Sequence, residues 1–253
     1  MAVFNRQSKI SHCGTDPLRR ITCSELLDEE RGTPREIQDS LDDLWRINRW
    51  LGGVSSTLKL LEGFLARAGV HPVRILDVGA GDSRLAARLQ VELRKRGVQA
   101  EFTALDRYLT HLQNGHQSVA LPQSVVADVW ALPFAEGSFN VVMCNLFFHH
   151  FSGQLAKQLL SRLAALASEA VVISDVERHW LPYLFIRHAR WFTRSPNTRH
   201  DAPASVRQAY TRHELAAVAA AAGFTDFEVR RFAPFRLGLT LWKPRGHWPV
   251  TSY

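Results

Sequence analysis

The feature that most constrains the fold is a short apolar run that ends in a glycine-rich turn. Residues 74–79 read Arg-Ile-Leu-Asp-Val-Gly, and the turn continues through Ala80 and Gly81 before a helical pattern begins at Ser83. An apolar strand that passes through glycines into a helix is typical of the first β-α unit of a parallel sheet, where the turn lets a ligand approach the backbone closely. The sequence therefore predicts an α/β protein.

Apolar segments alternate with helical patterns along the rest of the chain. Further strands are expected over residues 101–106, 124–128, 139–145 and 170–175, with a closing strand pair over residues 227–232 and 236–242. Helices are expected over residues 83–96, about 153–166 and 211–223, the last opening with a capping box. Strands separated by helices of this length predict a doubly wound, mostly parallel sheet with helices on both faces.

A helical cap precedes this alternation. Residues 33–36 read Thr-Pro-Arg-Glu, a capping box with proline at the first helical position, so a helix is expected from here to the glycine pair at 52–53. A second helix is expected over about residues 57–68. We expect an N-terminal tail and helical cap over residues 1–70, the main domain over residues 71–245 and a C-terminal tail over residues 246–253.

Composition excludes several classes of protein. Hydrophobic residues make up 46% and charged residues 22% of the chain, which is ordinary for a globular protein. The apolar runs are shorter than the roughly 20 residues that span a bilayer, and no signal peptide is expected. Three cysteines without paired spacing support neither a disulfide framework nor a zinc knuckle, so we expect a cytoplasmic protein without a metal. The oligomeric state, monomer or homodimer, and peripheral contact with a membrane are left open.

Much of the net charge of +7 lies between residues 177 and 213, where seven arginines accompany two acidic residues and several aromatic residues. This stretch follows the fifth strand, so we interpret residues 177–210 as a lid over the ligand-binding edge, suited to an apolar and anionic acceptor. The alternative is a solvated basic face with aromatics turned into the core. The predicted acceptor contacts, from the lid and from the first helix, are Trp180, Tyr183, Arg187, Trp191, Trp45 and Arg46.

Three acidic residues end three successive strands: Asp77, Asp106 and Asp128. A dinucleotide fingerprint would need a third glycine where this chain has Arg84, and Asp82 would repel a pyrophosphate at the helix N-terminus. A cofactor without phosphates fits better. S-adenosylmethionine (SAM) carries an amino group, a ribose diol and an adenine, each of which suits a carboxylate acceptor.

These segments, taken in order, resemble the class I SAM-dependent methyltransferases over about residues 70–245. The resemblance rests on residues 75–81, the strand that ends at Asp106, and residues 128–134 and 138–142. It implies a Rossmann-like, seven-stranded sheet with an antiparallel terminal strand. One departure is Ser83, where many relatives have glycine, and serine is expected to cap the helix there. The predicted cofactor contacts are Asp77, Gly79, Ala80, Gly81, Asp106, Arg107, Asp128, Val129 and Asn145.

Two histidines, His149 and His150, follow the fourth strand and are the candidate general bases, with His149 preferred. The alternative is that one packs or caps the next helix and the other is solvated. The resemblance favours the small-molecule branch, similar to ubiquinone, menaquinone and polyketide-tailoring enzymes of secondary metabolism. We therefore expect O- or C-methylation of a small, partly apolar metabolite. An RNA methyltransferase and a non-catalytic SAM-binding or membrane-surface protein are the alternatives, although nucleic acid is disfavoured because no Asn-Pro-Pro-aromatic loop follows the fourth strand.

Overall fold

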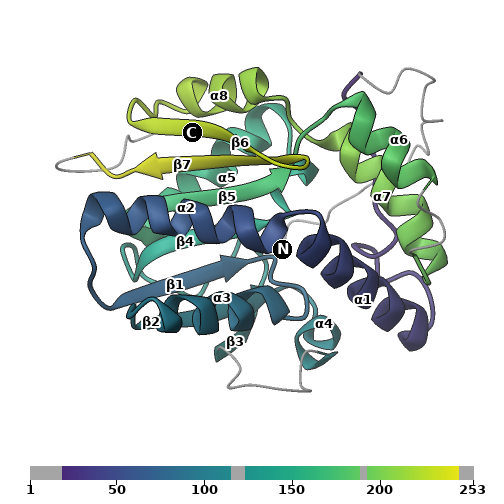
Figure 1. Ribbon diagram of the computed structural model, residues 1–253, viewed down its shortest axis with the longest axis horizontal. Coiled ribbons are helices and arrows are strands. Elements are labelled where there is room, and N and C mark those ends of the chain that lie inside the picture. The colour runs from purple at the N-terminus through teal and green to yellow at the C-terminus, as the bar shows by residue number, and fades with distance from the viewer. Residues whose placement is uncertain (1–18, 115–122, 189–192, 245–253) are drawn as a thin grey trace.

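A computed structural model describes residues 19–114, 123–188 and 193–244, which form a seven-stranded sheet of order β3-β2-β1-β4-β5-β7-β6 (Figure 1). The strands are β1 (Val73–Val78), β2 (Ala100–Asp106), β3 (Gln123–Val126), β4 (Phe139–Asn145), β5 (Ala167–Val176), β6 (Phe227–Phe232) and β7 (Arg236–Trp242). β7 runs antiparallel to β5 and β6, whereas the pairs among β1 to β5 are parallel. The expected Rossmann-like sheet with an antiparallel terminal strand is confirmed.

Helices cover both faces of the sheet. α2 (Gly53–Ala68) and α3 (Arg84–Lys95) pack on one face, and α5 (Gly153–Leu166) and α8 (Arg212–Ala221) pack on the other (Figure 1). Neighbouring residues of β1 point to opposite faces, so that Ile75 joins the core under α2 and α3 while Leu76 joins the core under α5 and α8. Burial on both faces explains why these strands read as continuous apolar runs.

The remaining helices gather near the carboxyl ends of the parallel strands. α1 (Pro34–Trp50), α6 (Trp180–His188) and α7 (Pro196–Gln208) lie together there, at the right of Figure 1. α4 (Leu109–Asn114) follows β2, and a short 3-10 helix, η1 (Phe148–His150), follows β4. Among the described residues, no helix combines the length and apolarity that crossing a membrane requires. This edge of the sheet is where an α/β protein binds its ligand.

The predicted capping boxes are confirmed at both helix starts. Thr33 accepts from the backbone N–H of Glu36 while the Glu36 carboxylate accepts from the Thr33 backbone, and Thr211 and Glu214 form the same reciprocal pair. These contacts satisfy N–H groups that have no partner within the helix. The local pattern therefore predicts where α1 and α8 begin.

Two element boundaries differ from the expectation. α2 begins at Gly53 rather than near Thr57, because Gly52 adopts a left-handed conformation (φ +79°) that lets α2 follow α1 almost directly. A Cβ at position 53 would lie 1.5 Å from Asn48 Oδ1, so the two helices meet at a point where only glycine fits. β3 ends at Val126, which leaves Asp128 two residues beyond the strand.

Candidate active site

The turn after β1 is fastened to the end of β2. The backbone N–H groups of Gly79 and Ala80 donate to Leu105 O at 2.9 and 3.0 Å, and Gly81 N–H donates to Asp106 Oδ2 at 2.8 Å. Gly79 and Gly81 have φ of +71° and +56°, values that favour glycine. At Gly79, an added Cβ would also lie 2.5 Å from the Phe147 ring. The turn and the first two strand ends therefore form one rigid unit.

Asp77 is a buried carboxyl at the base of this turn. Its residue is 1% exposed, and neither carboxyl oxygen has a hydrogen-bond partner. Burial, together with the nearby Asp106 carboxylate, raises the pKa of Asp77 to about 8. An acceptor pair without donors suits a ligand that brings a cationic N–H group.

Asp77 faces a pocket of about 100 Å³ between the strand ends and α1. Of the residues predicted to bind the cofactor, Asp77, the turn from Gly79 to Gly81 and Asn145 line this pocket. Asn145 donates to Thr57 Oγ1 at 3.3 Å, which holds the amide at the end of β4. The structure therefore brings the predicted turn and two predicted strand ends together. The rest of the lining comes from Leu41, Leu44, Trp45, Asn48, Asp82, Leu85 and Leu146.

Asp106, at the end of β2, and Asp128, just after β3, order the backbone around them. Asp106 accepts from the N–H groups of Gly81 and Tyr108, and Asp128 accepts from Trp130 N–H at 2.9 Å. Carboxylate oxygens retain further lone pairs for a ligand after such bonds are made. Val129, beside Asp128, is buried, whereas Arg107 is exposed with its guanidinium near the Tyr108 ring.

The start of α3 differs from the expectation at Ser83. Ser83 has φ +63°, makes no capping hydrogen bond, and its buried hydroxyl has no partner. The expectation that Ser83 caps the helix is therefore wrong, because the left-handed backbone turns its side chain away from the N–H groups of α3. Asp82 instead accepts from Arg84 N–H at 3.1 Å and pairs with the Arg84 side chain, which also pairs with Asp42 of α1.

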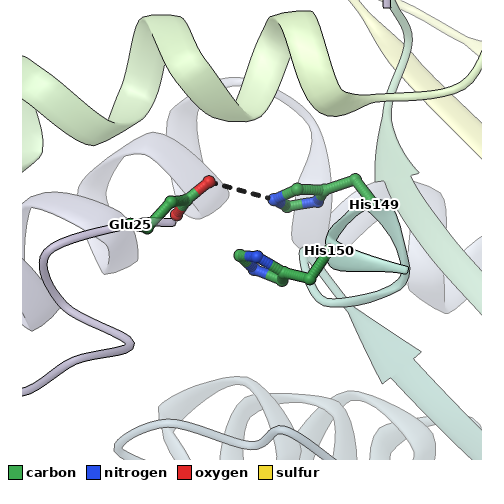
Figure 2. A group of neighbouring side chains, drawn as sticks. All are labelled: Glu25, His149 and His150. Carbon is green, nitrogen blue, oxygen red and sulfur yellow. Dashed lines mark ion pairs between the residues drawn. The ribbon is translucent and has the colours of Figure 1, made fainter. Parts of the chain in front are cut away.

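Carboxylates surround the preferred general base, His149. Its ring is 2% exposed, with Nδ1 2.8 Å from Asp175 Oδ1 and Nε2 3.5 Å from Glu25 Oε1 (Figure 2). Burial alone would lower the pKa of His149, but Asp175 and Glu25 raise it to about 10. A ring that is protonated at neutral pH cannot accept a proton, so these surroundings disfavour His149 as a general base.

His150 is more accessible than His149. Its side chain is 16% exposed, and its Nδ1 lies 3.1 Å from Asp28 Oδ2. The two imidazole rings lie side by side with centroids 4.2 Å apart, and both face Glu25 (Figure 2). His150 thus remains the better placed of the two for proton transfer.

Sequence reasoning missed Glu25 and Asp28. Both belong to the segment of residues 19–31, called the N-terminal segment below, which the sequence analysis left as a tail. No local pattern marks these acids, because their partners lie more than 120 positions away in the chain. Only the observed fold places them beside η1.

The predicted acceptor contacts are placed in different surroundings. Trp45 lines the pocket of Asp77, whereas Arg46 pairs with the buried Asp43. In α6, Trp180 and Arg187 are exposed and Tyr183 is half-buried, and none of these three lines the pocket of Asp77. Trp191 lies outside the described residues.

Two arginines of the predicted lid are buried in the protein. Arg178 is buried, donates to Ala209 O and pairs with Glu214, while Arg207 is 3% exposed. These two side chains are therefore neither free to bind an acceptor nor part of a solvated basic face.

A larger hollow lies elsewhere, on the edge of the sheet formed by β6 and α8. It has a volume of about 630 Å³ and is lined by charged residues that include Arg212, Glu228 and Arg230. Because it is remote from the carboxyl ends of the parallel strands, we assign the active site to the smaller pocket.

The fold and this pocket together define a class of protein. The strand order and the glycine turn after β1, with Asp77 beside it, resemble those of class I SAM-dependent methyltransferases. A SAM-dependent methyltransferase domain is the class that this fold and this pocket fit.

Comparison with known proteins gives the same class. Residues 75–169 match the family model of a methyltransferase domain. No curated protein sequence matches this chain significantly.

Solved structures of methyltransferases share the fold. The plantazolicin methyltransferase BpumL, in complex with a pentazolic desmethylPZN analog and SAH, is 13% identical with a TM-score of 0.61, over 83% of this chain and 95% of that chain. A SAM-dependent methyltransferase from Aquifex aeolicus is 18% identical with a TM-score of 0.57, over 84% and 99%. Magnesium protoporphyrin IX methyltransferase from Synechocystis PCC 6803 is 14% identical with a TM-score of 0.54, over 80% and 93%.

Proposed function

We propose that this enzyme transfers the methyl group of SAM to oxygen or carbon of a small, partly apolar metabolite of phenolic, quinone-like or polyketide type. The observation that carries the proposal is the buried Asp77 carboxyl, which faces the pocket with both oxygens free of hydrogen bonds. Structural neighbours named for plantazolicin and magnesium protoporphyrin IX support an acceptor that is not a nucleic acid.

The carboxylates at the strand ends are proposed to hold the cofactor. Asp77 accepts from the amino group of SAM, Asp106 from the ribose hydroxyls, and Asp128 with the Val129 N–H receives the adenine. The glycines of the turn bring backbone close to the cofactor, and Asn145 orients its amino acid part. When bound, SAM supplies an activated methyl group on a cationic sulfur.

Positioning of the acceptor is proposed to supply most of the catalysis. Trp45 on α1 lies against the pocket, and α6 presents apolar side chains at the same edge of the sheet. Fixing a nucleophile in line with the methyl group contributes about 7 to 11 kcal/mol in favourable intramolecular cases. For an acceptor hydroxyl, His150 is the candidate proton acceptor; a carbon nucleophile such as an enol needs less assistance.

A methylation screen tests the proposal. The protein is incubated with SAM and with phenolic, quinone and polyketide extracts, and products heavier by one methyl group are sought by mass spectrometry. Asp77→Asn is expected to abolish turnover, whereas Asp226→Asn, which alters an exposed ion pair with Arg67, is expected to leave it unchanged. Methylation of RNA with no small-molecule product would favour the nucleic-acid alternative, and SAM binding without any turnover would favour the non-catalytic one.

A further inference from the structure

A cluster of side chains that could bind a metal lies where the N-terminal segment meets η1, the 3-10 helix that follows β4. One ring nitrogen from each of His149 and His150 and one carboxylate oxygen of Glu25 lie within 4.8 Å of one another (Figure 2). Glu25 is 8% exposed and His149 2% exposed, so the cluster is not a chance grouping of solvated side chains. Imidazole nitrogen and carboxylate oxygen are the ligands of many zinc sites.

The contact between His149 and Glu25 has the spacing of two metal ligands. Nε2 of His149 lies 3.5 Å from Glu25 Oε1, and this buried nitrogen has no hydrogen-bond partner. Two ligands on one tetrahedral zinc ion, each about 2.0 to 2.2 Å from the metal, lie about 3.3 to 3.6 Å apart. At 3.5 Å the pair is longer than an ordinary hydrogen bond, and its spacing is close to the edge of a zinc tetrahedron.

The other nitrogen of His149 is held as it is in metal sites. Nδ1 lies 2.8 Å from Asp175 Oδ1, and the Asp175 carboxylate is itself held by the backbone N–H groups of His149 and Val176. A histidine that binds a metal almost always gives its second ring N–H to a carboxylate or carbonyl, which fixes the ring and its tautomer. The contact with Asp175 therefore orients the His149 ring so that its Nε2 faces the Glu25 carboxylate.

We propose that Glu25, His149 and His150 form a binding site for a divalent transition metal of zinc type, which fastens the N-terminal segment to η1 at the end of β4. This proposal differs from the expectation of a protein without a metal. That expectation rested on cysteine spacing, and the sequence does not show that Glu25 lies near the two histidines. It does not depend on the identity of the methyl acceptor.

The charge around the cluster favours a cation. Three carboxylates, those of Glu25, Asp28 and Asp175, lie within 3.5 Å of the two imidazole rings. A bound divalent cation would offset the negative charge of these carboxylates. Metal binding would also occupy both imidazoles, so acceptor deprotonation by His150 and metal binding by His150 are exclusive.

A titration with zinc tests the proposed site. The full-length chain is stripped with a chelator and titrated with Zn²⁺ alone by calorimetry, and one equivalent is expected to bind with micromolar affinity or tighter. His150→Ala is expected to weaken binding by at least about tenfold, and Asp175→Asn, which keeps the shape but loses the carboxylate, by about 10- to 100-fold. Zn²⁺ is also expected to raise the Tm of the wild type but not that of His150→Ala.

The matched control is His213→Ala, since His213 is an exposed histidine on α8 outside the cluster. His150 is partly exposed, so its variant is expected to fold, and circular dichroism checks this before the titration. Absence of zinc binding by the wild type, or equal affinity in the wild type and a folded His150→Ala, overturns the proposal. Glu25, His149 and Asp175 would then form a buried ion-pair network only.

Discussion

Asp77 is a buried carboxyl with no hydrogen-bond donor near it, so its ionised form is unfavourable. Because its pKa is raised to about 8, the free protein holds a proton on Asp77 at neutral pH. An ammonium ligand needs the anion, so binding must release this proton. The affinity for S-adenosylhomocysteine, which carries the same amino group, is therefore expected to fall about tenfold for each pH unit below about 8, as calorimetry at several pH values can measure.

The variant Asp77→Asn tests whether ionisation of Asp77 causes this pH dependence of binding. The amide has the same shape but cannot ionise, so its weaker binding is expected to vary far less between pH 6 and pH 8. Asp226→Asn, remote from the pocket, should retain the slope of the wild type. Identical slopes for the wild type and Asp77→Asn would show that the proton is released elsewhere.

Ser83 occupies a backbone conformation that suits glycine. Its φ of +63° costs a residue with a side chain about 1 to 2 kcal/mol, and its buried hydroxyl adds an unmet hydrogen bond. Glycine loses about 0.4 to 1 kcal/mol more conformational entropy on folding, which offsets part of the gain. Ser83→Gly is therefore expected to raise the free energy of unfolding by about 1 kcal/mol in urea denaturation. A lower stability of the variant would mean that the hydroxyl has a role that its contacts do not indicate.

Site residues were predictable where the chemistry follows strand order. Asp77, Asp106 and the turn glycines are fixed by their places at the ends of β1 and β2, and these places follow from local apolar patterns. The surroundings of His149 were not predictable, because Asp175 and Glu25 come from β5 and the N-terminal segment. Pairing with distant carboxylates converts a residue that the sequence suggests as a base into a buried cation.

Among the helices, α6 exposes an apolar surface that packing within the protein does not explain. Four large apolar side chains, Trp180, Leu181, Leu184 and Phe185, are each more than 40% exposed. If α6 forms part of the acceptor lid, replacing Trp180 and Phe185 by serine should raise the KM for the acceptor about tenfold, while KM for SAM and the Tm stay unchanged. The magnitude corresponds to one lost aromatic contact of about 1.4 kcal/mol.

The same variant distinguishes the alternative interpretations of α6. Unchanged acceptor kinetics, together with loss of co-sedimentation with anionic liposomes, would make α6 a membrane-surface helix instead of a lid. Replacing Val70, an exposed residue just before β1 at the opposite edge of the sheet, by serine serves as the control for a general change in surface polarity.

Element boundaries were predictable where a local signal ends the element. β4, β6 and β7 match the expected ranges because turn residues border their apolar runs, and the capping boxes mark α1 and α8. The start of α2 was not predictable, since it depends on the left-handed backbone of Gly52 and on the close packing of Asn48 against Gly53. Tertiary packing of this kind overrides the usual preference of glycine for ending helices.

At the scale of the whole molecule, the N-terminal segment joins parts of the fold that are far apart in sequence. Arg20 donates to His149 O, Phe151 O and Gln208 O, which ties the segment to η1 and α7. Tyr108, after β2, donates to Asp28 O at 2.8 Å. The sequence analysis placed residues 1–70 apart from the main domain, and this division remains a prediction.

Asp201 of α7 also anchors this segment. Its carboxylate is buried and accepts from the backbone N–H groups of Leu26 and Leu27 at 3.0 and 3.1 Å. Asp201→Ala leaves both donors unmet, so the free energy of unfolding is expected to fall by about 2 to 4 kcal/mol, measured by chemical denaturation.

Limited proteolysis locates the effect of losing Asp201. Because the lost bonds hold the N-terminal segment, cleavage within residues 19–31 should become faster than in the wild type, while the sheet stays protected. Asp226→Ala, which removes only an exposed ion pair, is expected to cost less than about 1 kcal/mol and to leave cleavage unchanged. Equal cleavage in Asp201→Ala and the wild type would mean that Arg20 and Glu25 hold the segment without Asp201, because those residues bond it to η1 and α7 independently.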